Sequence, residues 1–191
     1  MTDDRYYITF YGLKTNDWET DWGSFSDTNY HLVKEYLSDG CSTSSYSIWN
    51  GNGIKFIYPN YIKKKYYLEG VVEGHITFFA YAADSWVSDY QVTIFKANSS
   101  AVDTDLATTG VISVPTMLDY DVTWHTGEDR VFPFWIDVSS GKLIEENDRI
   151  GLRIQWDVSD GDGSRASVFL MHDNDSEFED VKITLPFNFG E

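Results

Sequence analysis

Cysteine and proline are scarce in this chain, and long apolar runs are missing. Of its 191 residues only one is a cysteine, Cys41, and four are prolines. A single cysteine rules out a disulfide within the chain and a zinc site built from cysteines. No run approaches the roughly 20 apolar residues that cross a bilayer, and residues 1–5 lack the basic and apolar regions of a secretion signal. We therefore expect a protein that is made in a cytosol and does not insert into a membrane.

Positive charge is also in short supply. Lys and Arg number 14 against 31 Asp and Glu, which gives a formal net charge of -17. Because nucleic-acid binding depends on Lys and Arg that neutralise phosphates, we expect no nucleic-acid partner. An acidic surface also repels its own copies until salt shortens the Debye length from about 10 Å at 0.1 M to about 3 Å at 1 M. The charge therefore predicts a salt-rich setting, halophilic or marine.

What the chain has in abundance is aromatic and β-branched residues. Aromatic residues make up 17% of the sequence and hydrophobic residues 42%, which is enough for a folded core. Apolar and polar residues roughly alternate in many short segments separated by Asp, Ser, Gly and Asn, as expected for strands joined by turns. These segments are 7–11, 54–58, 74–81, 91–97, 111–114, 120–125, 131–138, 149–158, 166–172 and 181–186. The pattern predicts an all-β, antiparallel, jelly-roll-like β-sandwich.

Helical spacing occurs in one segment, 29–37, so we expect at most one short helix. From about residue 66 the predicted strands are long and regular, and we assign residues 66–191 to the sandwich core. Residues 1–65 are predicted to be an N-terminal elaboration that contributes edge strands to the same continuous domain. The alternative is a docking segment that becomes ordered against a neighbouring protein.

Catalytic motifs are not apparent. The four histidines are scattered, and the sequence has neither a Gly-x-Ser-x-Gly turn nor a glycine loop that leads into a helix. A glycosidase would need two carboxyl groups about 5–9.5 Å apart in a cleft, a geometry that sequence does not supply. We expect no enzymatic activity and no organic cofactor.

Calcium is a candidate ligand of the Asp-rich segment 157–164, because Ca²⁺ prefers several oxygen ligands and this segment offers Asp157, Asp160 and Asp162. The segment lacks the full spacing of an EF-hand. The favoured alternative is a hairpin turn, in which Gly161 and Gly163 allow positive φ.

Two further groups of residues are candidates for binding. Trp86 lies near a predicted loop, where an exposed indole ring would stack on a sugar. Lys63, Lys64 and Lys65 form a basic cluster in an acidic protein, and Trp18 and Trp22 lie in an aromatic and acidic stretch. We assign these five residues to a candidate protein interface. The alternative for the lysines is protection of a sheet edge against strand addition.

The second half of the chain has a distinctive order of segments. Its most recognisable piece is Asn147-Asp148-Arg149-Ile150-Gly151-Leu152-Arg153-Ile154, with strand patterns at 69–81 and 91–100 before it and at 166–173 and 181–186 after it. This order resembles the jelly-roll-like β-sandwich of virion structural proteins of tailed viruses, over about residues 66–186. Members of this group commonly have Gly-Asp-Arg where this chain has Asn147-Asp148-Arg149. Asn147 replaces the glycine, and Asn tolerates the same left-handed backbone conformation.

The resemblance implies a virion protein that acts through protein contacts, as a capsid decoration or turret subunit or another head- or tail-associated subunit of a bacteriophage or archaeal virus. It also implies capsid or tail proteins of the same particle as partners, and a homo-oligomer, with a trimer favoured. The alternative function is a carbohydrate-binding β-sandwich module that attaches to host glycans, because similar sandwiches serve both purposes.

Overall fold

A computed structural model describes residues 5–14, 30–34, 53–80, 85–114, 128–160, 168–170 and 181–188. Within these ranges the chain forms strands and no helix. The strands are β1 (Arg5–Lys14), β2 (Tyr30–Val33), β3 (Ile54–Ile57), β4 (Tyr66–Leu68), β5 (Val71–Ala80), β6 (Ser85–Ala97), β7 (Asp103–Thr108), β8 (Ile112–Ser113), β9 (Glu128–Asp137), β10 (Lys142–Ile144), β11 (Arg149–Asp160), β12 (Val168–Leu170) and β13 (Val181–Asn188). The predicted all-β, sandwich-like fold is confirmed.

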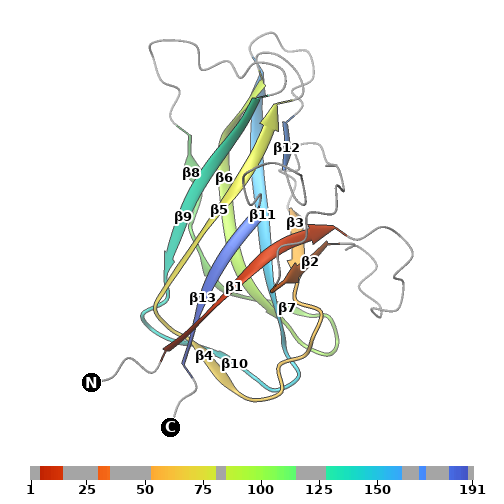
Figure 1. Cartoon of the computed structure of the whole chain (residues 1–191), viewed down its shortest axis with the longest axis vertical. Coiled ribbons are helices and arrows are strands. Elements are labelled where there is room, and N and C mark those ends of the chain that lie inside the picture. Colours follow the sequence, from red (N-terminus) through yellow and green to blue (C-terminus); the bar gives the residue numbers. More distant parts are fainter. Residues whose placement is uncertain are drawn as a thin grey trace.

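The strands form two layers that join along one side. One layer has the order β9-β5-β13-β1-β2, and the other has the order β3-β11-β6-β7. The layers meet where β2 pairs with β3 in parallel, His31 opposite Ile57, while the other pairings are antiparallel. Figure 1 shows β5, β6, β9 and β11 along the length of the molecule and β4 with β10 at its lower end. The sandwich is therefore almost closed into a barrel.

The core lies between the two layers and follows the alternation of the strands. On β5, Val72, Ile76 and Phe78 are fully buried, and the alternate residues Glu73, His75 and Thr77 lie on the opposite face of the strand. The ring of Phe78 packs on that of Trp156 from the opposite layer, with ring centroids 5.3 Å apart. Burying side chains of this size stabilises the fold by about 1.5–3 kcal/mol each.

The N-terminal part adds detail that the sequence pattern left open. The segment 29–37, the one candidate for a helix, forms strand β2 in its described part, because pairing with β1 satisfies its backbone and buries Leu32 to 1% exposure. Strand β1 does not lie at a sheet edge, since it pairs with β13 on one side and with β2 on the other. The predicted strand at 120–125 lies outside the described residues.

Candidate functional site

The segment 147–149 leads from a turn into strand β11 and has a structural role. Asn147 has a φ of 69°, a left-handed conformation that Asn tolerates. The Asp148 carboxylate is buried, accepts a hydrogen bond from the Glu145 N–H at 2.9 Å and forms an ion pair with Lys96 Nζ at 2.9 Å. These contacts fix the direction in which β11 leaves the preceding turn.

The same segment holds the loop that carries the predicted lysine cluster. The Ile62 N–H donates to the Asp148 carbonyl oxygen, and the Asn147 N–H donates to the Ile62 carbonyl oxygen, both at 2.8 Å. The guanidinium of Arg149 lies 4.2 Å from the centroid of the Tyr61 ring and donates a hydrogen bond to the Tyr61 hydroxyl. The loop is therefore anchored to β11 at several points.

Beside this loop lies an apolar cavity of about 440 Å³, which we call the basic-aromatic pocket. Its lining consists of inward-facing aromatic and aliphatic side chains from both layers with lysines among them: Ile8, Phe10, Lys34, Tyr58, Asn60, Tyr61, Ile62, Lys63, Tyr66, Ile150 and Phe187. Lys34 and Lys63 are exposed, and the Nζ of Lys34 lies 5.6 Å from the centroid of the Tyr58 ring. The pocket thus combines an aromatic interior with cationic groups, a combination suited to an acidic partner that carries an apolar side chain.

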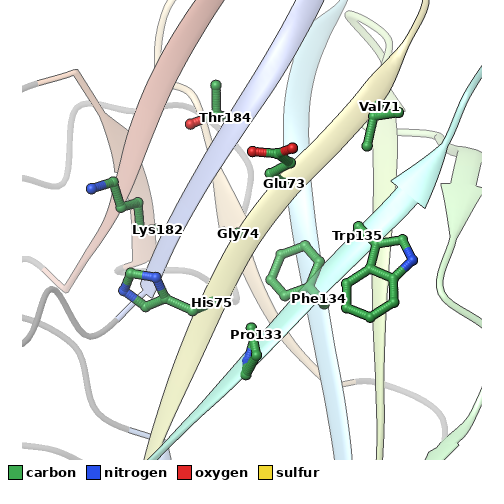
Figure 2. Close-up of a pocket in the computed structure, with 9 residues that line it drawn as sticks. All are labelled: Val71, Glu73, Gly74, His75, Pro133, Phe134, Trp135, Lys182 and Thr184. Atoms are coloured by element: carbon green, nitrogen blue, oxygen red, sulfur yellow. The ribbon is translucent and has the colours of Figure 1, made fainter.

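A second depression, of about 460 Å³, lies on the outer face of β9, β5 and β13, and we call it the Trp135 groove. Its lining is Val71, Glu73, Gly74, His75, Pro133, Phe134, Trp135, Lys182 and Thr184. Trp135 is 71% exposed, the largest exposed fraction among the large hydrophobic residues that the structure describes. Figure 2 shows Glu73 and His75 directed from β5 toward β13, with Trp135 on the other side of β5.

Strand register determines this arrangement. Trp135 pairs with Glu73, which pairs with Thr184, so the three side chains form one row across the outer face. Pro133, His75 and Lys182 form the next row in the same way. The Thr184 hydroxyl is hydrogen-bonded to the Thr9 hydroxyl at 3.0 Å, and Lys182 lies over the ring of Tyr11.

The structure places some of the predicted site residues and leaves others outside the described part. Lys63, Lys64 and Lys65 are exposed beside the basic-aromatic pocket. Trp18 and Trp22 lie outside the described residues, and of Trp86 only the backbone, on β6, is described.

The candidate calcium ligands are only partly described. Asp157 lies on β11 opposite Asp89, Asp160 ends that strand with its side chain outside the described part, and Asp162 lies outside it altogether. Among the described residues, no group of three or more His, Cys, Asp or Glu side chains is placed to hold a metal ion. The calcium site stays a prediction.

Sequence reasoning missed Trp135 and Lys34. Trp135 lies in the predicted strand 131–138, whose inward residues Phe132, Phe134 and Ile136 set the alternation, so its outward position follows from the pattern. The outward position of Trp135 was not predicted, because aromatic residues in strands are more often buried. Lys34 follows β2 and joins the lysine cluster only through the pairing of β2 with β3, which the sequence does not reveal.

Within the described ranges, no helix is long and apolar enough to cross a bilayer.

Comparison with known proteins finds likeness in structure alone. No family model matches the sequence, and no curated protein matches it. Two structures of a CocE/NonD family hydrolase from Staphylococcus aureus align with 96% and 97% of this chain, at TM-scores of 0.63 and 0.56 and identities of 10% and 12%. The chain spans 36% and 37% of the length of those hydrolase chains. At this identity the likeness concerns the fold and not the activity.

Weaker alignments involve an Eiger TNF from S. frugiperda, at a TM-score of 0.40, 10% identity and coverage of 98% of this chain and 96% of that one. The infectious bursal disease virus Gx strain aligns at a TM-score of 0.29 and 12% identity, over 98% of this chain and 36% of the viral chain. Similarities at these scores carry no argument about function.

Proposed function

We propose that the protein is a non-enzymatic structural subunit of a virus particle, and that it acts through protein contacts at the basic-aromatic pocket. The particle assignment rests on the resemblance of residues 66–186 to virion proteins of tailed viruses. The observation that carries the contact function is that Lys34 and Lys63, from distant parts of the sequence, line the same aromatic pocket in a chain whose net charge is -17.

Charge complementarity supports this proposal. A few cations exposed on an acidic molecule attract the acidic faces of identical or neighbouring subunits. Apolar side chains at the centre of such a contact supply affinity when the partner excludes water from them. Tyr58 and Tyr66 line the pocket, are only partly buried, and are available for that role.

The anchored loop supports the proposal in a second way. Because Ile62 exchanges backbone hydrogen bonds with the start of β11, the neighbouring lysine at 63 is held without help from a partner. A contact that is organised in advance costs less ordering entropy when it forms. We propose that the protein is made in the host cytoplasm and acts in the virion as a homo-oligomer, with a trimer favoured and with capsid or tail proteins as neighbours.

Reversal of one charge tests this function. Purified particles that lack the protein are incubated with wild-type chain, with Lys63→Glu, or with Lys142→Glu, and are then sedimented. Lys142 is exposed on β10 and does not line the pocket, so its variant makes the same charge change as a control. We expect Lys63→Glu to bind the particles about tenfold more weakly than wild type, which corresponds to about 1.4 kcal/mol, and Lys142→Glu to bind as wild type does. Equal binding of all three proteins would contradict a contact at this pocket.

A further inference from the structure

The Trp135 groove has a chemistry different from that of the basic-aromatic pocket. It lies on the outer face of β9, β5 and β13, whereas the basic-aromatic pocket is lined by inward-facing residues such as Phe10 and Ile150. Its volume of about 460 Å³ lies within the usual range for a small-molecule site, about 300–1,000 Å³. Nothing in the proposed particle contact uses this groove.

The dominant feature of the groove is an indole that the fold leaves in water. Trp135 is 71% exposed although it lies on a strand whose neighbours Phe134 and Ile136 are buried in the core. An exposed tryptophan contributes little to the stability of the fold, because the stabilisation comes from apolar surface that is removed from water. A flat exposed indole instead presents a π-face on which the C–H groups of a sugar ring can stack.

The polar residues of the groove are placed to hydrogen-bond the hydroxyl groups of such a ring. Glu73 and Thr184 continue the row that starts at Trp135, and neighbouring strands are about 4.8 Å apart, so the row spans about 10 Å. The Glu73 carboxylate accepts hydrogen bonds, and the Thr184 hydroxyl both donates and accepts them. His75 and Lys182 add ring nitrogens and an ammonium group in the adjacent row.

The charges in the groove favour a neutral ligand. One carboxylate, Glu73, and one ammonium group, that of Lys182, lie in it, so the groove carries no excess of either sign. The net charge of -17 on the whole chain disfavours anionic sugars. We propose that the Trp135 groove binds a neutral pyranose oligosaccharide, with one sugar ring stacked on Trp135 and bonded by Glu73, and with the next sugar within reach of the Thr184 hydroxyl, which keeps hydrogen-bonding capacity beside its bond to Thr9.

Nuclear magnetic resonance of the indole N–H groups tests this site. The Trp135 signal is assigned by its absence from the spectrum of Trp135→Phe, and the full chain is titrated with neutral oligosaccharides of glucose, galactose, mannose and N-acetylglucosamine. We expect at least one of them to shift the Trp135 signal with millimolar or tighter affinity. Trp135→Ala and Glu73→Gln should each weaken that binding about tenfold or more.

Tyr6→Ala serves as the matched control, since Tyr6 is an exposed aromatic residue on β1 that does not line the groove. We expect this variant to bind the oligosaccharide as wild type does, and all three variants to keep the wild-type melting temperature, because the altered side chains are exposed. No shift of the Trp135 signal with any sugar in the panel would overturn the proposal. A second result would also overturn it: wild type binds no sugar, and Trp135→Ala no longer binds particles. The groove would then be a protein contact. The Lys63→Glu experiment remains informative in either case.

Discussion

Tyr90 connects the two layers of the sandwich through a hydrogen bond from its hydroxyl group and through the packing of its ring. It lies on the inner face of β6, only 4% exposed, and its hydroxyl donates a hydrogen bond to the carbonyl oxygen of Pro133 on β9 at 3.3 Å. Its ring packs edge-on against Phe132, with centroids 5.4 Å apart. Burial raises the pKa of Tyr90 above its ordinary value of 10.0, because the phenolate would lose its hydration. This residue therefore makes the stability of the fold depend on pH in the alkaline range.

The sign of that dependence follows from the protons bound in each state. As pH rises above about 10, Tyr90 loses its proton in the unfolded chain and keeps it in the folded one, so the free energy of unfolding falls with pH. Tyr90→Phe removes this contribution and should lose less stability than wild type between about pH 9 and pH 11. It should also cost about 0.5–1.5 kcal/mol at neutral pH through the lost hydrogen bond. Urea unfolding of both proteins from neutral pH to about pH 11 measures both effects. Parallel declines in their free energies of unfolding would show that Tyr90 is not responsible for the pH dependence.

At the level of elements, the pairing of β11 with β6 is the longest ladder in the described part of the fold, running from Arg149 opposite Ala97 to Asp160 opposite Ser85. Gly151 and Phe95 face each other in this ladder on the outer side of the layer. The Phe95 ring is fully buried there, because it lies across the bare backbone of Gly151 and beneath Lys55. These residues form a small buried cluster on the outer face of β6 and β11 that is separate from the main core.

Gly151→Ala should disturb that packing. A Cβ at this position would overlap the Phe95 ring, so the ring would have to move from its site. We expect a loss of about 1–3 kcal/mol in unfolding free energy, the usual cost of overpacking. Phe95→Leu supplies the control: it should cost less in the Gly151→Ala background than in wild type, because the shorter side chain relieves the clash. Additive costs in a denaturant series would contradict the account of this contact.

How far the elements could be predicted depends on how plainly a strand alternates and how local its partners are. The alternation within 74–81 predicts a strand, and β5 (Val71–Ala80) forms over that segment but begins three residues earlier and so includes Val72. The segment around Leu32 has an ambiguous pattern, and only the pairing of β2 with the distant residues of β1 and β3 makes it a strand. Both pockets depend on such long-range pairing. Composition could indicate the lysines at 63–65, whereas their proximity to Lys34 and the row from Trp135 to Thr184 required the structure.

For the molecule as a whole, we expect the net charge of -17 to make the stability of the fold depend on salt. The described ion pairs on the outer face of the second layer, Lys55 with Asp103 and Arg153 with Asp105, each at 2.7 Å, neutralise few of the acidic groups. The remaining carboxylates repel one another in the folded state, and added salt screens that repulsion.

We therefore expect the melting temperature to rise by several degrees between low salt and molar NaCl. Molar KCl should have a similar effect, because screening depends on ionic strength and not on the identity of the cation. A thermal unfolding series in the two salts measures this. A melting temperature that is unchanged or lower at molar salt would contradict the salt-rich setting that the sequence predicts.

The central claim, that this protein is a structural subunit of a virus particle, is tested most directly by quantitative mass spectrometry of particles purified by density gradient from the source culture. The account predicts that the protein bands with the particles and is present in a fixed ratio to the shell protein, with the ratio unchanged after a second gradient. A structural subunit that occupies equivalent positions on a symmetric particle must show such a ratio. Absence of the protein from the particle band, or a ratio that falls with each gradient, would contradict the claim.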